Sequence, residues 1–376
     1  MGGRSPESKT NDVGYSRSAE RRIRRQCEMK AEKKVIGHLE KCYAVAPLFY
    51  NNKNHILVAA EKRNACLLFA LDGTQEDVVW TEPGGTMSMV QIPGSNGQFL
   101  ATHRFYSPND SKEAEIVCVT PEAKGEWKVN TVVKLPFVHR FDILERNGTR
   151  YLIACTLKSN HSYRDDWSSP GKVYAAVLPD DLTIFSGSQQ LHLHVIYSGL
   201  TKNHGYCRAA EKNMETAVIS AEEGVFHFIP PADISGKWEI EKILDEPCSD
   251  GVLIDLDGDG MRELAVISPF HGDSVSIYKK RDKTFEKIYT YGKSAEFSHA
   301  IFGGTLCGKP TVVIGHRKGE RNLIAFSFSP ETGTYSSQIL DSGCGAANIY
   351  KYNVGKEEYI AAANRETDEI VIYNIK

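Results

Sequence analysis

Short runs of apolar and β-branched residues, separated by Gly, Asn and Asp, recur along the whole chain, whereas the 3.6-residue periodicity of helices is scarce. These runs repeat. Aligning the second strand of each unit gives HILVAAEK, QFLATHRF, RYLIACTL, TAVISAEE, ELAVISPF, TVVIGHRK and EYIAAANR. The segments are anchored on Leu57, Leu100, Leu152, Val218, Leu264, Val312 and Ile360. The pattern therefore predicts an all-β protein of seven units.

The spacing of the anchors predicts the architecture. Successive anchors are 43, 52, 66, 46, 48 and 48 residues apart, which is the length of a four-stranded propeller blade and too long for a turn of a β-helix. The last unit supplies three strands before the chain ends, which would leave an open edge. The segment KKVIGHLEK, residues 33–41, has strand character. We predict that it completes the seventh blade and closes one domain, residues 32–376.

The residues before this domain have a different composition. Eight basic residues lie between Arg17 and Lys34, with almost no apolar ones. We predict a disordered basic leader over residues 1–31, and an arm that binds nucleic acid is the alternative. Because MKAEKKVIGHLEK reads as a natural N-terminus, Met29 is a candidate start of translation.

The overall composition excludes several partners. The net charge of -3 gives no global basic field, so neither nucleic acid nor a membrane is expected as a partner. The nine cysteines form no CxxC pair and lie mostly in apolar runs, as reduced cysteines do. With no signal peptide and no apolar run near 18 residues, a cytoplasmic protein is predicted.

Histidines gather on one face of the predicted disc. In a propeller blade the first strand lines the channel and the second runs back, so starts of first strands and ends of second strands share a face. Seven of the twelve histidines fall there: His139, His204 and His299 before or at first strands, His103, His271 and His316 after second strands, and His161 in an insertion of the third unit. Independent loop histidines would scatter over both faces.

Converging imidazoles predict a metal site. His139, His204 and His299 occupy comparable positions in three units and are the predicted ligands of a divalent transition metal, zinc or manganese. The alternative set, His103, His271 and His316, is otherwise predicted to be catalytic, since imidazole transfers protons near neutral pH.

Neighbouring side chains complete the predicted site. Arg104 and Arg317 each follow a histidine and could bind a carboxylate or a polarised oxygen through the guanidinium fork, so they are predicted to be catalytic, together with Tyr163. The residues predicted to bind substrate are His161, Trp167, Arg365 and Glu222. Loop packing is an equal alternative for the aromatic residues. A hydrolase using Glu222, Glu223, Asp165 and Asp166 is less well supported, because adjacent carboxylates on a strand point apart.

An acidic loop follows the first strand of the fifth unit. Asp255, Asp257, Asp259 and Glu263 have the spacing that wraps oxygen ligands around a hard cation, with Gly260 allowing the tight turn. Both flanks read as strands rather than as the helices of an EF-hand. A structural calcium site is therefore predicted here, on the face opposite the histidines.

The loop DLDGDGMREL resembles those of FG-GAP or VCBS blades. With seven blades and a histidine-lined channel mouth, residues 33–376 resemble the propeller part of aldos-2-ulose dehydratase and, more distantly, propeller polysaccharide lyases, which use His and Tyr in β-elimination. This resemblance and the site residues predict a carbon–oxygen lyase, a metal-assisted dehydratase or an isomerase acting on a small sugar or keto-sugar. The alternative is a non-catalytic propeller that binds a glycan or a protein partner.

Overall fold

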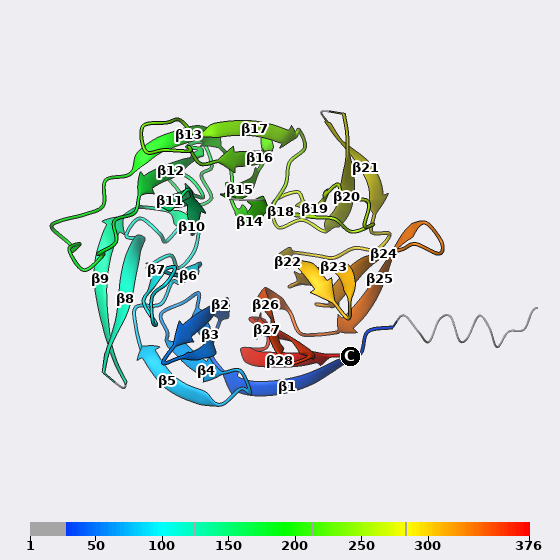
Figure 1. The fold of residues 1–376 in the computed structure, drawn as a ribbon, viewed down its shortest axis with the longest axis horizontal. Helices are drawn as coiled ribbons and strands as arrows, with labels where there is room; N and C mark the ends of the chain where they lie inside the picture. Colours follow the sequence, from blue (N-terminus) through cyan, green and yellow to red (C-terminus); the bar gives the residue numbers. More distant parts are fainter. Residues whose placement is uncertain (1–27, 124, 212–213, 283) are drawn as a thin grey trace, which may run out of the picture.

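Seven blades of four antiparallel strands surround a central channel in the computed structural model of the protein (Figure 1). The structure describes residues 28–123, 125–211, 214–282 and 284–376. The strands pair in chain order within each blade, except that β1 pairs with β28 in blade 7, and the innermost strands are β2, β6, β10, β14, β18, β22 and β26. Blades 3 and 4 join into one eight-stranded sheet through the pair Arg146 and Met214.

The strand bounds follow the repeat. Blade 1 contains β2 (Cys42–Tyr50), β3 (Lys53–Ala60), β4 (Cys66–Ala70) and β5 (Gln75–Trp80). Blade 2 contains β6 (Met89–Gln91), β7 (Phe99–His103), β8 (Glu115–Ala123) and β9 (Glu126–Lys134). Blade 3 contains β10 (Val138–Arg146), β11 (Thr149–Thr156), β12 (Gly171–Val177) and β13 (His194–Leu200). Blade 4 contains β14 (Gly205–Glu211), β15 (Met214–Ala221), β16 (Gly224–Ile229) and β17 (Glu239–Leu244).

The remaining blades repeat the arrangement. Blade 5 contains β18 (Asp250–Ile254), β19 (Glu263–Ser268), β20 (Ser274–Arg281) and β21 (Thr284–Thr290). Blade 6 contains β22 (Ser298–Leu306), β23 (Lys309–His316), β24 (Leu323–Ser329) and β25 (Thr334–Asp341). Blade 7 contains β26 (Ala346–Val354), β27 (Glu357–Asn364), β28 (Glu369–Ile375) and the N-terminal strand β1 (Ala31–His38).

The second strands carry the core between the blades. All seven anchor residues of the repeat lie in these strands, and each is 0% exposed. Their near-continuous apolar sequences follow from this position, because a strand packed on both faces has no polar side.

Strand β1 forms the outer edge of blade 7. It pairs antiparallel with β28, from Ala31 opposite Ile375 to His38 opposite Glu369. Residues predicted to belong to the leader already take part in the fold: the Met29 N–H donates to Gln338 Oε1 at 2.8 Å, and the Lys30 N–H donates to the Lys376 carbonyl at 2.8 Å. The domain therefore includes residues before the predicted boundary at 32, whereas the rest of the predicted leader, residues 1–27, lies outside the described residues.

Four first strands begin with the same β-bulge. In β2, β10, β22 and β26 the register with the second strand shifts, so that one residue lies opposite no partner: Tyr43, His139, His299 and Ala347. The residue two places earlier has a left-handed backbone conformation, with positive φ, in each case: Lys41, Phe137, Phe297 and Gly345. Because a bulge re-aims a side chain, this repeated irregularity brings residues of several blades to one level of the channel.

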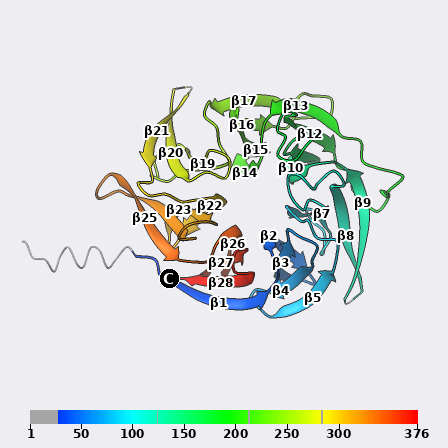
Figure 2. The same cartoon turned by 180° about the vertical axis from the view of Figure 1, so that it is seen from behind.

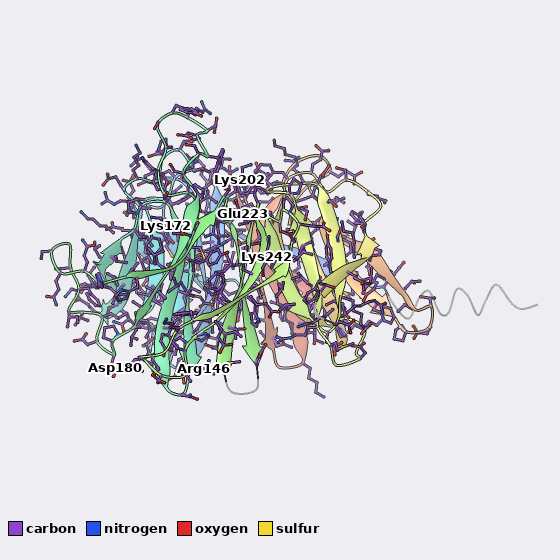
Figure 3. All side chains as sticks on the ribbon, turned by 90° about the horizontal axis from the view of Figure 1, so that it is seen from above. Arg146, Lys172, Asp180, Lys202, Glu223 and Lys242 are labelled. Carbon is purple, nitrogen blue, oxygen red and sulfur yellow. The ribbon has the colours of Figure 1, made fainter. Side chains whose placement is uncertain are left out.

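The disc has two distinct faces. We call the face that carries the starts of the first strands the start face, and the face with the hairpins between first and second strands the hairpin face. In the side view, Lys202 lies near the start face, whereas Arg146 and Asp180 lie at the hairpin face (Figure 3). The reverse view shows the same closed ring (Figure 2). No helix within the described residues is long and apolar enough to cross a membrane.

Candidate functional site

Four histidines from four neighbouring blades meet near the channel axis. We call His139, His204, His271 and His299 the histidine cluster. Measured from His204, the ring centroids of the other three lie at 4.5 Å, 4.8 Å and 5.0 Å, in that order. His139, His204 and His299 are at most 3% exposed. The ring of blades thus brings together residues that are up to 160 positions apart in the chain, from 139 to 299.

Hydrogen bonds fix the tautomers of two of these rings. Nδ1 of His204 lies 2.7 Å from Asp250 Oδ2, and Nδ1 of His299 lies 2.7 Å from the Ala347 carbonyl oxygen. Because both partners are acceptors, each Nδ1 donates its proton, which leaves Nε2 as the nitrogen of each ring that faces the other clustered residues. A carboxylate or carbonyl behind a ligating histidine is the usual outer-shell arrangement of a metal site.

Three members of the cluster fit a divalent transition metal. The ligand atoms of His204, His271 and His299 all lie within 4.8 Å of one another, and the Nε2 atoms of His204 and His271 are 3.2 Å apart. A tetrahedral zinc ion with bonds of about 2.0–2.1 Å separates its nitrogen ligands by about 3.3 Å. His271 therefore takes the place that the sequence prediction gave to His139.

His139 and Tyr43 lie beside these three residues. The Tyr43 hydroxyl donates to His299 Nε2 at 2.8 Å, a hydrogen bond that a metal ion on this nitrogen would replace, and it lies 3.5 Å from His139 Nε2. Burial, and after it neighbouring positive charge, lowers the pKa of His139 well below its usual value, so the ring is neutral. Burial raises the pKa of Tyr43 to about 12, so the phenol keeps its proton near neutral pH. A proton acceptor and a proton donor thus stand next to each other.

Aromatic rings cover the cluster on the start face. The His271 ring is stacked between Phe270 and Phe297, with centroid distances of 3.9 Å and 4.4 Å. Phe105 packs edge-on against His139 at 5.1 Å. The cluster therefore lies beneath an apolar cover on the face where an open mouth was predicted.

A cavity of about 540 Å³ reaches the cluster from the other side. Asp250 and His299 lie at its inner end, and the lining continues along the first strands to Pro47 and Arg208. His299 is 2% exposed, whereas Pro47 and Arg208 are exposed, so the cavity opens toward the hairpin face. The predicted channel mouth is corrected accordingly: the cluster is covered on the start face, and its member His299 lines the inner end of this cavity.

His103 and His316 do not join the cluster. The His103 ring packs edge-on against Trp80 at 4.7 Å. Both ring nitrogens of His316 form hydrogen bonds within the loop that follows it. Nδ1 lies 2.9 Å from the Lys318 carbonyl oxygen, and Nε2 accepts from the Asn322 N–H at 2.9 Å. His103, His271 and His316, the alternative metal set, therefore do not come together, and the hydrogen bonds of His316 stabilise its own loop.

The buried His103 makes stability depend on pH. Burial, assisted by the charge of Arg104, lowers its pKa to about 3. The unfolded state, with a pKa near 6.5, binds the proton first, so the free energy of unfolding is intact above about pH 6.5 and falls as the pH drops toward 3. Between pH 7 and pH 5, the free energy of unfolding should fall by about 2 kcal/mol less in His103→Phe than in the wild type, as measured by urea unfolding. Equal losses in both proteins would contradict this expectation.

The predicted arginines already have carboxylate partners. Arg317 pairs with Glu366 at 2.8 Å and lies over the Phe297 ring at 4.8 Å. Arg365 pairs with both Glu366 and Glu61. Arg104 has a left-handed backbone conformation, and its side chain pairs with Glu115 at 3.2 Å. These ion pairs offset the positive charges that were predicted to bind substrate or a polarised oxygen.

The insertion after β11 lies on the start face, outside the cavity. The Tyr163 side chain is 67% exposed, and its carbonyl oxygen lies 3.2 Å from His161 Nδ1. Trp167 packs edge-on against Phe270 at 5.7 Å, and Glu222 pairs with Lys202. Trp167, and Glu222 through Lys202, therefore lie beside the cover of the cluster, and none of the four residues lines the central cavity.

The acidic loop between β18 and β19 contains a cation supplied by the chain. The Lys279 ammonium contacts Asp257, Asp259 and Glu263 at 2.5 Å, 2.6 Å and 3.1 Å. Ligand oxygens of Asp255, Asp257 and Glu263 lie within 4.8 Å of one another, which also fits a calcium ion. Calcium here stays a prediction, and it would have to displace the lysine.

Sequence reasoning missed three residues of the site: Tyr43, Asp250 and Arg140. Tyr43 occupies the bulge position that holds a histidine in β10 and β22, so strand register was a usable signal for it. Asp250 is the first residue of β18 in blade 5. It forms a hydrogen bond with His204, which precedes β14 of the neighbouring blade 4. Arg140 follows His139 directly and lines the cavity.

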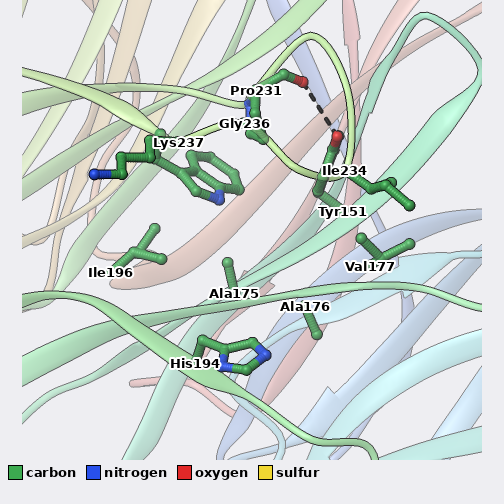
Figure 4. A pocket seen from close by; sticks show the side chains of 11 residues that line it. Tyr151, Ala175, Ala176, Val177, His194, Ile196, Pro231, Ile234, Gly236 and Lys237 are labelled. Carbon is green, nitrogen blue, oxygen red and sulfur yellow. Dashed lines mark hydrogen bonds between the residues drawn. The ribbon is translucent and has the colours of Figure 1, made fainter.

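A second pocket lies on the outer side of blades 3 and 4 (Figure 4). It has a volume of about 400 Å³ and is lined by Ala175 and Val177 of β12, Tyr151, and the loop that carries Ile234 and Trp238. Tyr151 donates a hydrogen bond to the Pro231 carbonyl across it, at 3.1 Å. Its lining is mostly apolar and includes none of the clustered histidines.

No protein-family model matches the sequence, and no curated protein matches it. Solved structures do match. Virginiamycin B lyase from Staphylococcus aureus aligns over 92% of this chain and 99% of its own, with 14% identity and a TM-score of 0.56. The Dos1 propeller aligns over 88% and 78%, with 7% identity and a TM-score of 0.54.

A third similar structure is a candidate 6-phosphogluconolactonase from Bacteroides uniformis, aligned over 87% of this chain and 90% of its own, with 15% identity and a TM-score of 0.51. Identities this low show the fold alone. The resemblance to FG-GAP blades and to aldos-2-ulose dehydratase stays a prediction, and the comparisons show that the chain has the β-propeller fold.

Proposed function

We propose that the protein is a metal-assisted carbon–oxygen lyase that acts on a small sugar-type substrate in the central channel. The observation that carries the proposal is the close approach of His204, His271 and His299, backed by Asp250 and the Ala347 carbonyl, with His299 and Asp250 lining a cavity. When bound there, a zinc or manganese ion would supply a Lewis acid that polarises a carbonyl or carboxylate oxygen of the substrate.

The residues beside the three ligands suit proton transfer. The neutral His139 accepts the proton from the carbon next to the polarised carbonyl, and the electrons of that C–H bond form a carbon–carbon double bond. The C–O bond on the adjacent carbon breaks, and the departing oxygen takes the proton of the Tyr43 phenol. The contact of 3.5 Å between Tyr43 Oη and His139 Nε2 is short enough for the proton to return and restore both groups.

The apolar cover supports this chemistry. Phe105, Phe270 and Phe297 exclude water from the start face of the cluster, which strengthens electrostatic interactions within it. The cavity volume of about 540 Å³ suits a ligand of one or two sugar rings, in the range of small-molecule sites.

A non-catalytic propeller that binds a partner is the second candidate. It is favoured by the apolar pocket of Figure 4, where Ile234 is 72% exposed and Val177 is 44% exposed. Exposed apolar side chains around a pocket are typical of a binding surface.

Metal analysis together with a substrate panel separates the two candidates. We expect about one zinc or manganese ion per chain in the purified protein, measured by plasma mass spectrometry, because one three-histidine set is assembled. Incubation with sugar acids and keto-sugars is expected to yield an unsaturated product, detected by ultraviolet absorbance. Absence of a transition metal, or binding without turnover across the panel, would favour the binding propeller.

A further inference from the structure

One guanidinium in the central cavity has no carboxylate partner. Arg140, which follows the bulge in β10, donates to the Met87 carbonyl at 2.9 Å and lies 3.5 Å from Asn348 Oδ1. Among the described residues no Asp or Glu forms an ion pair with it, although Arg104, Arg317 and Arg365 are all paired. An arginine has five N–H donors, so most of the Arg140 fork is available to a ligand.

The position of Arg140 places this charge near the histidine cluster. It lines the same cavity as His299 and Asp250, and its chain neighbour His139 belongs to the cluster. A ligand held by Arg140 would therefore lie on the channel side of the cluster.

The other charged side chains of the cavity already have partners within the chain. Arg208 pairs with Asp142 through two hydrogen bonds and with Glu215 at 2.9 Å. Asp250 forms its hydrogen bond with His204. The Arg140 guanidinium, by contrast, has no carboxylate partner among the described residues, and its planar fork matches the two oxygens of a carboxylate.

We propose that Arg140 anchors a carboxylate of a small sugar-type acid that enters the channel from the hairpin face. The inference rests on the proposed function, since it takes the histidine cluster as the reacting centre and names the class of its substrate. A carboxylate bound at Arg140 would place the molecule in the same cavity as His299, which contacts Tyr43.

Equilibrium binding tests the proposal without any need for turnover. By titration calorimetry, D-glucuronate is expected to bind the wild-type protein at least about 10-fold more tightly than neutral D-glucose, because a charge-assisted hydrogen bond distinguishes them. Arg140→Gln should weaken D-glucuronate binding about 10- to 100-fold and leave D-glucose binding unchanged. Arg140→Lys, which keeps the charge but loses the fork, should fall between the two.

The matched control is the double variant Asp142→Asn/Arg208→Gln, which removes the paired charges of the same cavity and keeps its net charge. It should bind D-glucuronate as the wild type does, and unchanged unfolding midpoints would show that all variants are folded. Equal affinity for the acid and the neutral sugar, or equal losses in Arg140→Gln and the control, would overturn the proposal. Tighter binding of glucose 6-phosphate than of D-glucuronate would also overturn the carboxylate assignment. Selective binding of D-glucuronate without turnover would support the role of Arg140 and contradict the proposed lyase activity.

Discussion

Replacement of His204 by alanine is expected to remove the bound transition metal and to abolish turnover. His204 Nε2 faces His271 at 3.2 Å, and Asp250 orients the ring from behind, so the substitution removes both a ligand and its supported geometry. The loss of metal affinity should exceed about 100-fold, because even an outer-shell partner is worth about 10- to 100-fold. Metal content after dialysis against a weak chelator measures it.

Asp250→Asn provides a graded companion to this experiment. The amide keeps the size of the side chain but not its charge, so we expect about a 10- to 100-fold loss of metal affinity. His192→Ala is the control, since His192 is exposed and outside the cluster. If His204→Ala retained as much metal as His192→Ala, the three-histidine site would be excluded.

His139→Gln and Tyr43→Phe are each expected to lower kcat by about 100- to 10,000-fold with little change in metal content. The substitution His139→Gln removes the proton acceptor. Tyr43→Phe removes only the phenolic oxygen, which lies 2.8 Å from His299 Nε2. Product formation under saturating substrate, combined with metal analysis of the same samples, measures both quantities.

The paired readouts separate proton transfer from metal binding. Tyr43 is 2% exposed and phenylalanine has nearly the same shape, so the variant should fold. A Tyr43→Phe protein with full metal and full kcat would show that the phenol donates no proton. Loss of metal in His139→Gln would instead assign His139 to the ligand set.

The fold was largely predictable because its repeat is local. Each second strand is apolar on both sides, and this pattern is visible in any single unit, as around Leu57 or Ile360. The boundary at residue 32 was less predictable, since Met29 and Lys30 are held by Gln338 and the last residue of the chain, contacts that only the closed ring creates.

The site was predictable in part. Register brought His139, His204 and His299 to one level, as expected, but His271 reaches them only through a loop with a left-handed backbone (φ 48°). The bulge at His139 also breaks the alternation of the strand, so that His139 joins the cluster while the next residue, Arg140, lines the cavity.

The paired arginines show a second limit of the sequence. Arg317 and Arg365 follow strand ends as predicted, yet each meets a glutamate supplied from the neighbouring part of the ring, Glu366 or Glu61. Whether a guanidinium is available for a ligand depends on such long-range pairs. No local motif encodes them.

The lysine within the acidic loop has a consequence for where this propeller can work. Because Lys279 places one ammonium among Asp257, Asp259 and Glu263, the turn between β18 and β19 keeps part of its charge compensation at the low free calcium levels found inside cells. Blade 5 would then tolerate calcium-poor surroundings, because the ammonium already contacts two of the three carboxylates, Asp257 and Glu263, that could hold a metal ion.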